Sequence, residues 1–227
     1  LLNKMRKLIL DTETTGLDYE NDRIIEIACL EMINDSHTGK KYHEYYGTDG
    51  IIISDQAEQI HGLNNKFLKD FKTFDQKIME FVDFVDDSPL IIHNAQFDIS
   101  MINSALKRCG KKIINYDSAI CTLEMSKKKF PGSKNNLNAL CRRFDISLED
   151  RVKHSALTDC YLLLQVYTEL LGGRQGKLGL SVKERKGKKY DEVSKSSSFL
   201  DIKVSDEEQV SHSKMLEKID SPIWNKS

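Results

Sequence analysis

In Leu8-Ile9-Leu10-Asp11-Thr12-Glu13-Thr14-Thr15-Gly16 an apolar run leads directly into two carboxylates, followed by two hydroxyls and a glycine. A continuous apolar run is typical of a strand covered on both faces. Side chains two residues apart on a strand leave the same face, so Asp11 and Glu13 converge if the strand continues through them. A divalent cation is the usual remedy for two converging carboxylates. The stretch alone leaves two interpretations, half of a metal site or a polar strand end with two solvated acids.

The composition indicates one domain with a polar appendage. The chain has 227 residues, of which 39% are hydrophobic and 30% are charged, and its net charge is −1. This balance shows no overall basic signature for nucleic acid, although a local groove with metal ions is sufficient for such binding. Five scattered cysteines without a C-x-x-C pair predict reduced thiols, and no apolar run approaches the length of a membrane span. We therefore expect a soluble cytoplasmic protein.

The patterns along the chain predict an α/β fold with a central mixed sheet flanked by helices. Strands are predicted at 8–10, 23–32, 41–46 and 90–92, with a turn cluster at 34–39 and a weaker strand or strand-to-helix junction at 117–123. Helices are predicted after the capping residues Ser54 and Thr73, after the strand at 90–92, and over 123–130, 137–144 and 156–171.

The sequence changes character near residue 174. Residues 174–200 hold eight lysines and arginines against three acidic residues, and they are rich in glycine and serine. Such a segment cannot bury enough apolar surface to offset its ordering entropy, so we expect a flexible basic linker. Residues 201–227 regain scattered apolar side chains that suit a segment ordered by a partner. The predicted organisation is a folded domain at 1–173, the linker at 174–200 and a binding segment at 201–227.

Three residues elsewhere in the chain extend the acidic pair. Asp98 follows the predicted strand at 90–92, where functional loops gather in open α/β sheets, although an acid also suits a helix N-terminus. Asp159 falls inside the last helix among apolar residues, so it needs a partner, for which metal is one candidate. His154 lies five residues earlier, about 140° around a regular helix. We therefore expect His154 to precede the helix and turn toward the site; an exposed histidine at a helix start is the alternative.

Together the four acids suit a pair of divalent ions. Asp11, Glu13, Asp98 and Asp159 are expected to hold two ions about 4 Å apart, the separation used for in-line displacement at phosphorus. A histidine such as His154 is suited to take a proton from water at neutral pH. This chemistry needs no covalent nucleophile, and the chain has no glycine-rich phosphate cradle.

Three motifs, in this order, resemble those of the DEDD 3′–5′ exonucleases of the histidine subclass. They are Asp-x-Glu-Thr-Thr-Gly at 11–16, His-Asn-x-x-Phe-Asp at 93–98 and His-x-Ala-x-x-Asp at 154–159. Residues 23–27, 60–62 and 130–132 are also similar to proofreading (epsilon) subunits of bacterial DNA polymerase III, so the resemblance covers about residues 6–173. It implies a ribonuclease-H-like α/β fold and removal of mismatched nucleotides from a single-stranded or frayed DNA 3′ end, with release of 5′-monophosphates.

The resemblance also implies roles for individual residues. His154 is the expected general base, and Asp11 and Glu13 share the catalytic role with it. The expected ligands of two Mg²⁺ or Mn²⁺ ions are Asp11, Glu13, Asp98 and Asp159. The expected contacts to the terminal nucleotide are Asp11, Glu13, Thr14, Thr15, Gly16, Leu17, Gln56, His61 and Asp159. Gln56 stands where the epsilon subunits often carry a glutamate.

The C-terminal part resembles two docking segments. Residues 175–180, Gln-Gly-Lys-Leu-Gly-Leu, are similar to the peptide that binds sliding clamps, which implies contacts by Gln175, Leu178 and Leu180. Residues 201–227, with the single tryptophan Trp224, resemble the part of epsilon subunits that binds the polymerase alpha subunit, and an aromatic residue suits an interface anchor. The alternatives are an accidental match in a linker and a frayed terminus.

Two other functions compete with a proofreading subunit. A stand-alone exoribonuclease or RNA-trimming enzyme has the same motifs but does not need the tail. A non-catalytic binding module that keeps the fold does not need all four acids and the histidine. We therefore predict a 3′–5′ proofreading exonuclease subunit of the replicative DNA polymerase.

Overall fold

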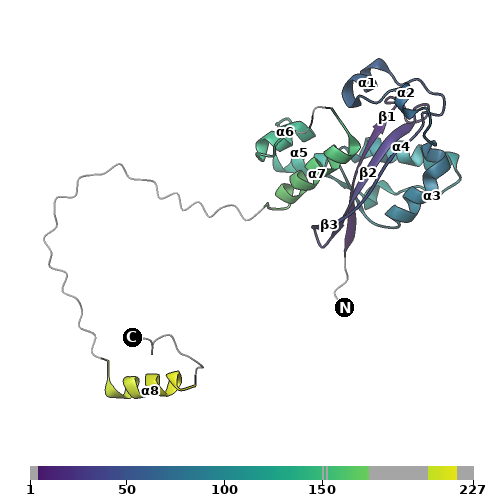
Figure 1. Ribbon diagram of the computed structural model, residues 1–227. Helices are drawn as coiled ribbons and strands as arrows, with labels where there is room; N and C mark the ends of the chain where they lie inside the picture. Colours follow the sequence, from purple (N-terminus) through teal and green to yellow (C-terminus); the bar gives the residue numbers. More distant parts are fainter. Residues whose placement is uncertain (1–4, 150, 152, 174–203, 219–227) are drawn as a thin grey trace, which may run out of the picture. The chain divides into compact units, whose positions relative to one another are not determined.

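A computed structural model describes residues 5–149, 151, 153–173 and 204–218, which fall into two units. The first unit holds a sheet with helices α1 to α7, and the second holds helix α8 (Figure 1). The predicted linker at 174–200 lies outside the described residues, as do 201–203 and 219–227 of the predicted binding segment. Among the described helices, none is long and apolar enough to cross a membrane.

Five strands form one mixed sheet in the order β3-β2-β1-β4-β5. Their bounds are β1 Arg6–Thr14, β2 Ile24–Ile33, β3 Ser36–Tyr45, β4 Leu90–Ile92 and β5 Ile120–Cys121. Strand β2 pairs antiparallel with β1 and β3, whereas β4 pairs parallel with β1 and β5. The predicted mixed sheet is confirmed, and so is the buried strand at 90–92.

The central strand β1 is longer than the apolar run that predicts it. It continues to Thr14, and its register with β2 sets Asp11 opposite Ala28 and Glu13 opposite Glu26. The predicted bounds 8–10 are therefore corrected to 6–14. Pairing with β2 satisfies the backbone groups whatever the side chains are, so hydropathy alone underestimates the length of this strand.

The turn between β2 and β3 is shorter than the polar cluster at 34–39 predicts. Only Asn34 and Asp35 form it, with φ of 52° and 60°, the conformation of a two-residue type I′ turn. Residues 36–39 belong instead to β3, which corrects the prediction. Gly39, with φ of 87°, and a register shift between Leu30 and Met32 let these small polar residues join the strand.

Helices pack on both faces of the sheet (Figure 1). Side chains alternate along β1, so Leu8 and Leu10 pack with helices α3 and α4, whereas Ile9 packs with α6 and α7. The helix bounds are α1 Asp55–His61, α2 Asn65–Leu68, α3 Phe74–Val85, α4 Ala95–Arg108, α5 Thr122–Lys129, α6 Leu137–Arg143 and α7 Ala156–Leu170, with a 3₁₀ turn at Tyr116–Ser118. Helix α2 is not predicted, because four residues are too few to show a helical period.

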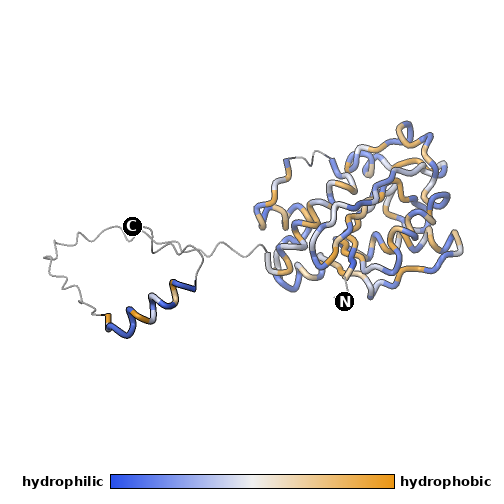
Figure 2. The backbone as a smooth tube through the Cα atoms, turned by 60° about the horizontal axis from the view of Figure 1, so that its bottom comes forward, coloured by the Kyte–Doolittle hydropathy of each residue, from blue (hydrophilic) through white to orange (hydrophobic). Residues whose placement is uncertain are grey.

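Capping explains where the predicted helices begin. The Ser54 side chain accepts a hydrogen bond from the Ala57 N–H, and Thr73 forms a capping box with Gln76. In Figure 2 the helices carry alternating hydrophobic and hydrophilic residues, as elements with one buried face do.

In the second unit, helix α8 (Asp206–Leu216) also starts with a capping box, between Ser205 and Glu208. Within residues 204–218 no helical residue is buried, and Val210 and Met215 are exposed. The helix thus has apolar side chains that the rest of residues 204–218 does not cover.

The packing of α3 against the sheet is testable with a matched pair of substitutions. Phe81 is 1% exposed and Met79, on the same helix, is 46% exposed. Phe81→Ala should lower the free energy of unfolding by about 3–5 kcal/mol, because it leaves a cavity in the core. Met79→Ala should change it by less than about 0.5 kcal/mol, as surface substitutions usually do. Denaturant unfolding measures both, and equal effects would contradict this packing.

Candidate active site

The end of β1 gathers carboxylates from both faces of the sheet. Asp11 and Glu13 share the face of Ile9, which α7 covers, and Asp159 lies in the first turn of α7. Thr12 points to the opposite face, where its hydroxyl donates to Asp98 Oδ1 at 2.8 Å. Asp98 lies in the first turn of α4, directly after β4.

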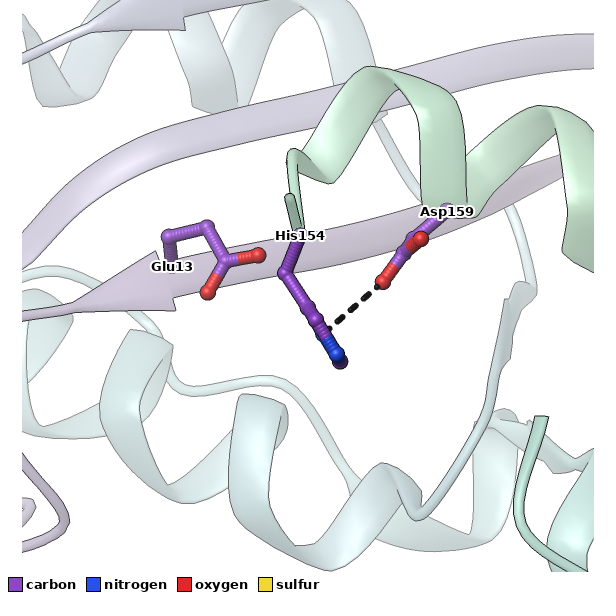
Figure 3. Close-up of side chains that lie close together, drawn as sticks. All are labelled: Glu13, His154 and Asp159. Atoms are coloured by element: carbon purple, nitrogen blue, oxygen red, sulfur yellow. Dashed lines mark ion pairs between the residues drawn. The ribbon is translucent and has the colours of Figure 1, made fainter. Parts of the chain in front are cut away.

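Glu13, His154 and Asp159 form a group of potential metal ligands (Figure 3). One ligand atom from each residue lies within 4.8 Å of those of the other two. His154 precedes α7, whose N-cap is Ser155, so the prediction that it lies before the helix is confirmed. Its Nδ1 atom is 3.3 Å from Asp159 Oδ2, and its side chain is 43% exposed.

Three of the four acids have strongly raised pKa values. Burial, followed by repulsion from Asp98 and Glu13, holds the pKa of Asp11 well above its usual value. Burial and repulsion from Asp159 raise the pKa of Glu13 to about 8. Burial raises the pKa of Asp98 to about 7, against the hydrogen bond from Thr12. Oxygen ligands that repel one another in this way fit hard divalent cations, whose charge would favour the ionised carboxylates.

Asp159 differs from the other acids because it has a cationic partner, Arg151. Arg151 donates from Nε to Asp159 Oδ1 at 2.6 Å and from Nη2 to Oδ2 at 2.5 Å. Burial raises the pKa of Asp159, but hydrogen bonds from His154 and Arg151 outweigh it, so the pKa ends below its usual value. Arg151 also donates to Asn138 Oδ1, and its Nη2 lies 3.0 Å from His154 Nδ1.

Sequence reasoning missed Arg151 and Asn138. The available signal was a basic residue three positions before His154, but nothing in the sequence pairs it with Asp159 or with the α6 residue Asn138.

The loop after β1 is held rigidly by its own side chains. The Thr15 side chain is buried and donates to Asp22 Oδ1 at 2.7 Å, while Thr14 donates to the Gly16 carbonyl at 2.5 Å. A Cβ atom on Gly16 would collide with the Asp22 carboxylate, so a side chain at this position would displace the carboxylate that Thr15 is bonded to. Leu17, at the end of this loop segment, is 76% exposed.

Helix α1 contributes the remaining predicted contacts. Gln56 is exposed, whereas His61 is buried in the last turn. His61 Nδ1 accepts from the Leu63 N–H at 3.0 Å, so the neutral ring carries its proton on Nε2, and burial lowers its pKa. Within the described residues Nε2 makes no hydrogen bond of good geometry, although the Thr14 backbone lies near. A ligand oxygen would satisfy this donor.

A third missed residue, Glu26 on β2, supports the start of α7. Its side chain is 1% exposed, and its Oε1 accepts from the Ser155 hydroxyl at 3.0 Å and contacts His43 Nε2 at 2.8 Å. The His154 N–H donates to the Ile60 carbonyl at 3.1 Å, which joins the same loop to α1. These contacts hold His154 in front of the acids.

A basic cleft of about 450 Å³ lies beside His154. Its lining includes three cationic side chains, those of Arg142, Arg151 and Lys153. Cations next to an acidic cluster suit a polyanion whose phosphate approaches bound metal. The predicted partner contacts Gln175, Leu178, Leu180 and Trp224 lie outside the described residues.

The raised pKa values predict how the stability of the metal-free protein depends on pH. The unfolded chain loses the protons of Asp98 and Glu13 near pH 4, whereas the folded protein keeps them until about pH 7 and 8. The folded state therefore binds more protons between these limits, and stability falls as pH rises through this window. Thermal unfolding in EDTA should show a falling melting temperature from about pH 5 to 8.

Asp98→Asn is the matched control, because it mimics the protonated acid and should reduce this pH dependence to the part that Glu13 contributes. A melting temperature that rises over the same window would contradict the carboxylate cluster.

Comparison with known proteins identifies the family of this chain. Residues 8–167 match the protein-family model described as Exonuclease. DNA polymerase III subunit epsilon of Rickettsia felis is 47% identical over 178 residues, which is 77% of each chain. The same subunit of Rickettsia typhi is 40% identical over 226 residues, covering 96% of this chain and 98% of the relative.

A solved structure supports the fold. The structure of Exonuclease X in complex with 5′ overhanging duplex DNA is 25% identical in sequence to this chain, with a TM-score of 0.55. The match covers 72% of this chain and 90% of the Exonuclease X chain. The mixed five-stranded sheet flanked by helices is thus the ribonuclease-H-like fold expected from the motifs. The chain therefore belongs to the exonuclease family and, within it, to the proofreading 3′–5′ exonuclease (epsilon) subunits of bacterial DNA polymerase III.

Proposed function

We propose that this chain removes mismatched nucleotides from a DNA 3′ end by two-ion hydrolysis, releasing 5′-monophosphates. The observation that carries this proposal is the convergence of Glu13, His154 and Asp159 at the end of β1, with Asp11 and Asp98 interacting electrostatically with the same group. Family membership implies dependence on a divalent metal ion. The oxygen ligands suit Mg²⁺ or Mn²⁺.

In this proposal Asp11, Glu13, Asp98 and Asp159 hold two ions. Such ions, when bound, would supply an activated water and would stabilise the leaving oxygen during in-line displacement at phosphorus. The partly exposed His154 ring accepts a proton from the attacking water, and Glu26 positions the loop through Ser155.

The terminal nucleotide would lie against the rigid loop after β1 and the end of α1. The exposed Leu17 packs on the base or sugar, and the free Nε2–H of His61 donates to a nucleotide oxygen. Thr14 and Gly16 form the loop floor, and Gln56 reaches in from α1. Thr15 contributes by holding the loop, since its hydroxyl and backbone groups are already bonded to protein. A mismatched end frays at little cost, so single-stranded ends are preferred.

The names of the relatives support DNA as the substrate and a replicative polymerase as the partner. A stand-alone exoribonuclease is not favoured by these names. We assign residues 201–227 to binding of the polymerase alpha subunit and residues 175–180 to a sliding clamp. The alignment with the Rickettsia typhi subunit extends into this tail, which supports a shared role. Such assemblies would act in the bacterial cytoplasm.

The catalytic assignment is tested on a 3′-labelled mismatched DNA primer with Mg²⁺. Asp11→Ala should abolish cleavage, and His154→Ala should lower the rate by about 10²–10⁴-fold, the usual contribution of a general base. Asp87→Ala removes an acid whose side chain is 96% exposed and should keep the wild-type rate. Undiminished cleavage by the Asp11 variant would refute the assignment, and faster cleavage of a matched RNA would favour the exoribonuclease.

The tail assignment is tested by deletion and by point substitution. A chain ending at residue 200 should lose binding to the alpha subunit but keep cleavage of free oligonucleotides. Gln175→Ala with Leu178→Ala should weaken clamp binding in surface plasmon resonance. Unchanged affinity in either experiment would demote that segment to a linker, whereas loss of cleavage would mean that the tail belongs to the catalytic fold.

A further inference from the structure

We propose that Arg151 competes with the metal ions for Asp159. Its guanidinium must leave Asp159 before that carboxylate can bind a divalent cation. The inference rests on the proposed role of Asp159 as a metal ligand. Arg151 lies outside the three motifs, and this role gives it control over how tightly the metal ions are bound.

The contacts of Arg151 engage both oxygens of Asp159. Nε donates to Oδ1 at 2.6 Å and Nη2 donates to Oδ2 at 2.5 Å, the two-point geometry in which arginine holds a carboxylate most strongly. The two side chains are 6% and 5% exposed. Water therefore screens this pair little, and the pair holds Asp159 more firmly than an ion pair at the surface would.

The other acids have no comparable partner. Among the described residues, Arg151 is the only lysine or arginine that forms a salt bridge with one of the four proposed ligands. Asp98 has a neutral hydroxyl donor, Thr12. A divalent ion bound to the same oxygens would lie within a few ångströms of the guanidinium, where like charges repel strongly in a site of low dielectric constant. The two cations therefore compete for Asp159.

The cleft beside His154 can accommodate the displaced guanidinium. The basic cleft of about 450 Å³ beside His154 is lined by Arg151 itself and by Asn138, which already accepts a hydrogen bond from its Nη1. Turning about this contact would move the positive charge from the acids into the open cleft, where solvent screens its repulsion from Arg142 and Lys153. Arg151 thus keeps Asp159 neutralised until metal arrives.

Calorimetric titration of the full chain with Mn²⁺ tests the competition. Arg151→Gln should bind Mn²⁺ about tenfold more tightly than wild type, because it removes a charge-assisted pair that the ion otherwise has to break. Arg142→Gln is the matched control, since it removes one positive charge from the same cleft without touching Asp159, and its affinity should stay within about twofold. Unchanged binding by Arg151→Gln would overturn the inference. So would the roughly 10–100-fold weakening expected if Arg151 oriented a metal ligand.

A measurement on the wild-type protein keeps the test independent of folding of the variant. The side-chain Nε–H resonance of Arg151, assigned with Arg151→Lys, should lose its hydrogen-bonded shift when Mg²⁺ saturates the site. A resonance that does not move would show that the guanidinium stays on Asp159. Asp159→Asn tests the ligand role of Asp159 separately from the competition by Arg151, because wild-type Mn²⁺ affinity in this variant would refute that ligand role. Loss of Mn²⁺ binding there, with no effect of Arg151→Gln, would refute only the competition.

Discussion

Mutual repulsion of buried carboxylates at the end of β1 is the constraint on which the site depends. Folding brings Asp11, Glu13, Asp98 and Asp159 together, because strand pairing and the core packing of neighbouring residues fix the positions of their backbones. Burial then raises the pKa of three of them, so added positive charge would favour their ionised forms. The fold is thus stabilised by its apolar layers and bears an electrostatic cost at one strand end, which bound cations relieve.

The alternation of side chains along β1 explains how one strand serves both layers. Leu8 and Leu10 anchor α3 and α4, and Ile9 anchors α7 on the other face. Past the apolar run the same alternation directs Asp11 and Glu13 toward α7, while Thr12 reaches Asp98 on α4. The residues that hold the layers and the residues that form the site therefore follow one periodicity, and a shift of the register by one residue would destroy both.

Much of this arrangement could be predicted from the sequence because it depends on local periodicity. The 140° offset between His154 and Asp159 places the histidine before α7, and the buried run at 90–92 places Asp98 at a strand end. The extent of β1 could not be predicted, since its polar half is held by pairing with β2 rather than by burial. Nor could the pair of Arg151 and Asp159, or the contact of Glu26 with Ser155, because such pairs depend on which loops meet in three dimensions.

Anomalous diffraction from crystals grown with Mn²⁺ would show whether these carboxylates jointly hold the ions proposed to carry out hydrolysis. We expect two anomalous peaks about 4 Å apart, bounded by Asp11, Glu13, Asp98 and Asp159, with the Arg151 guanidinium turned away from Asp159. Manganese bound elsewhere, or an Arg151 still paired with Asp159 beside fully occupied ions, would contradict this expectation.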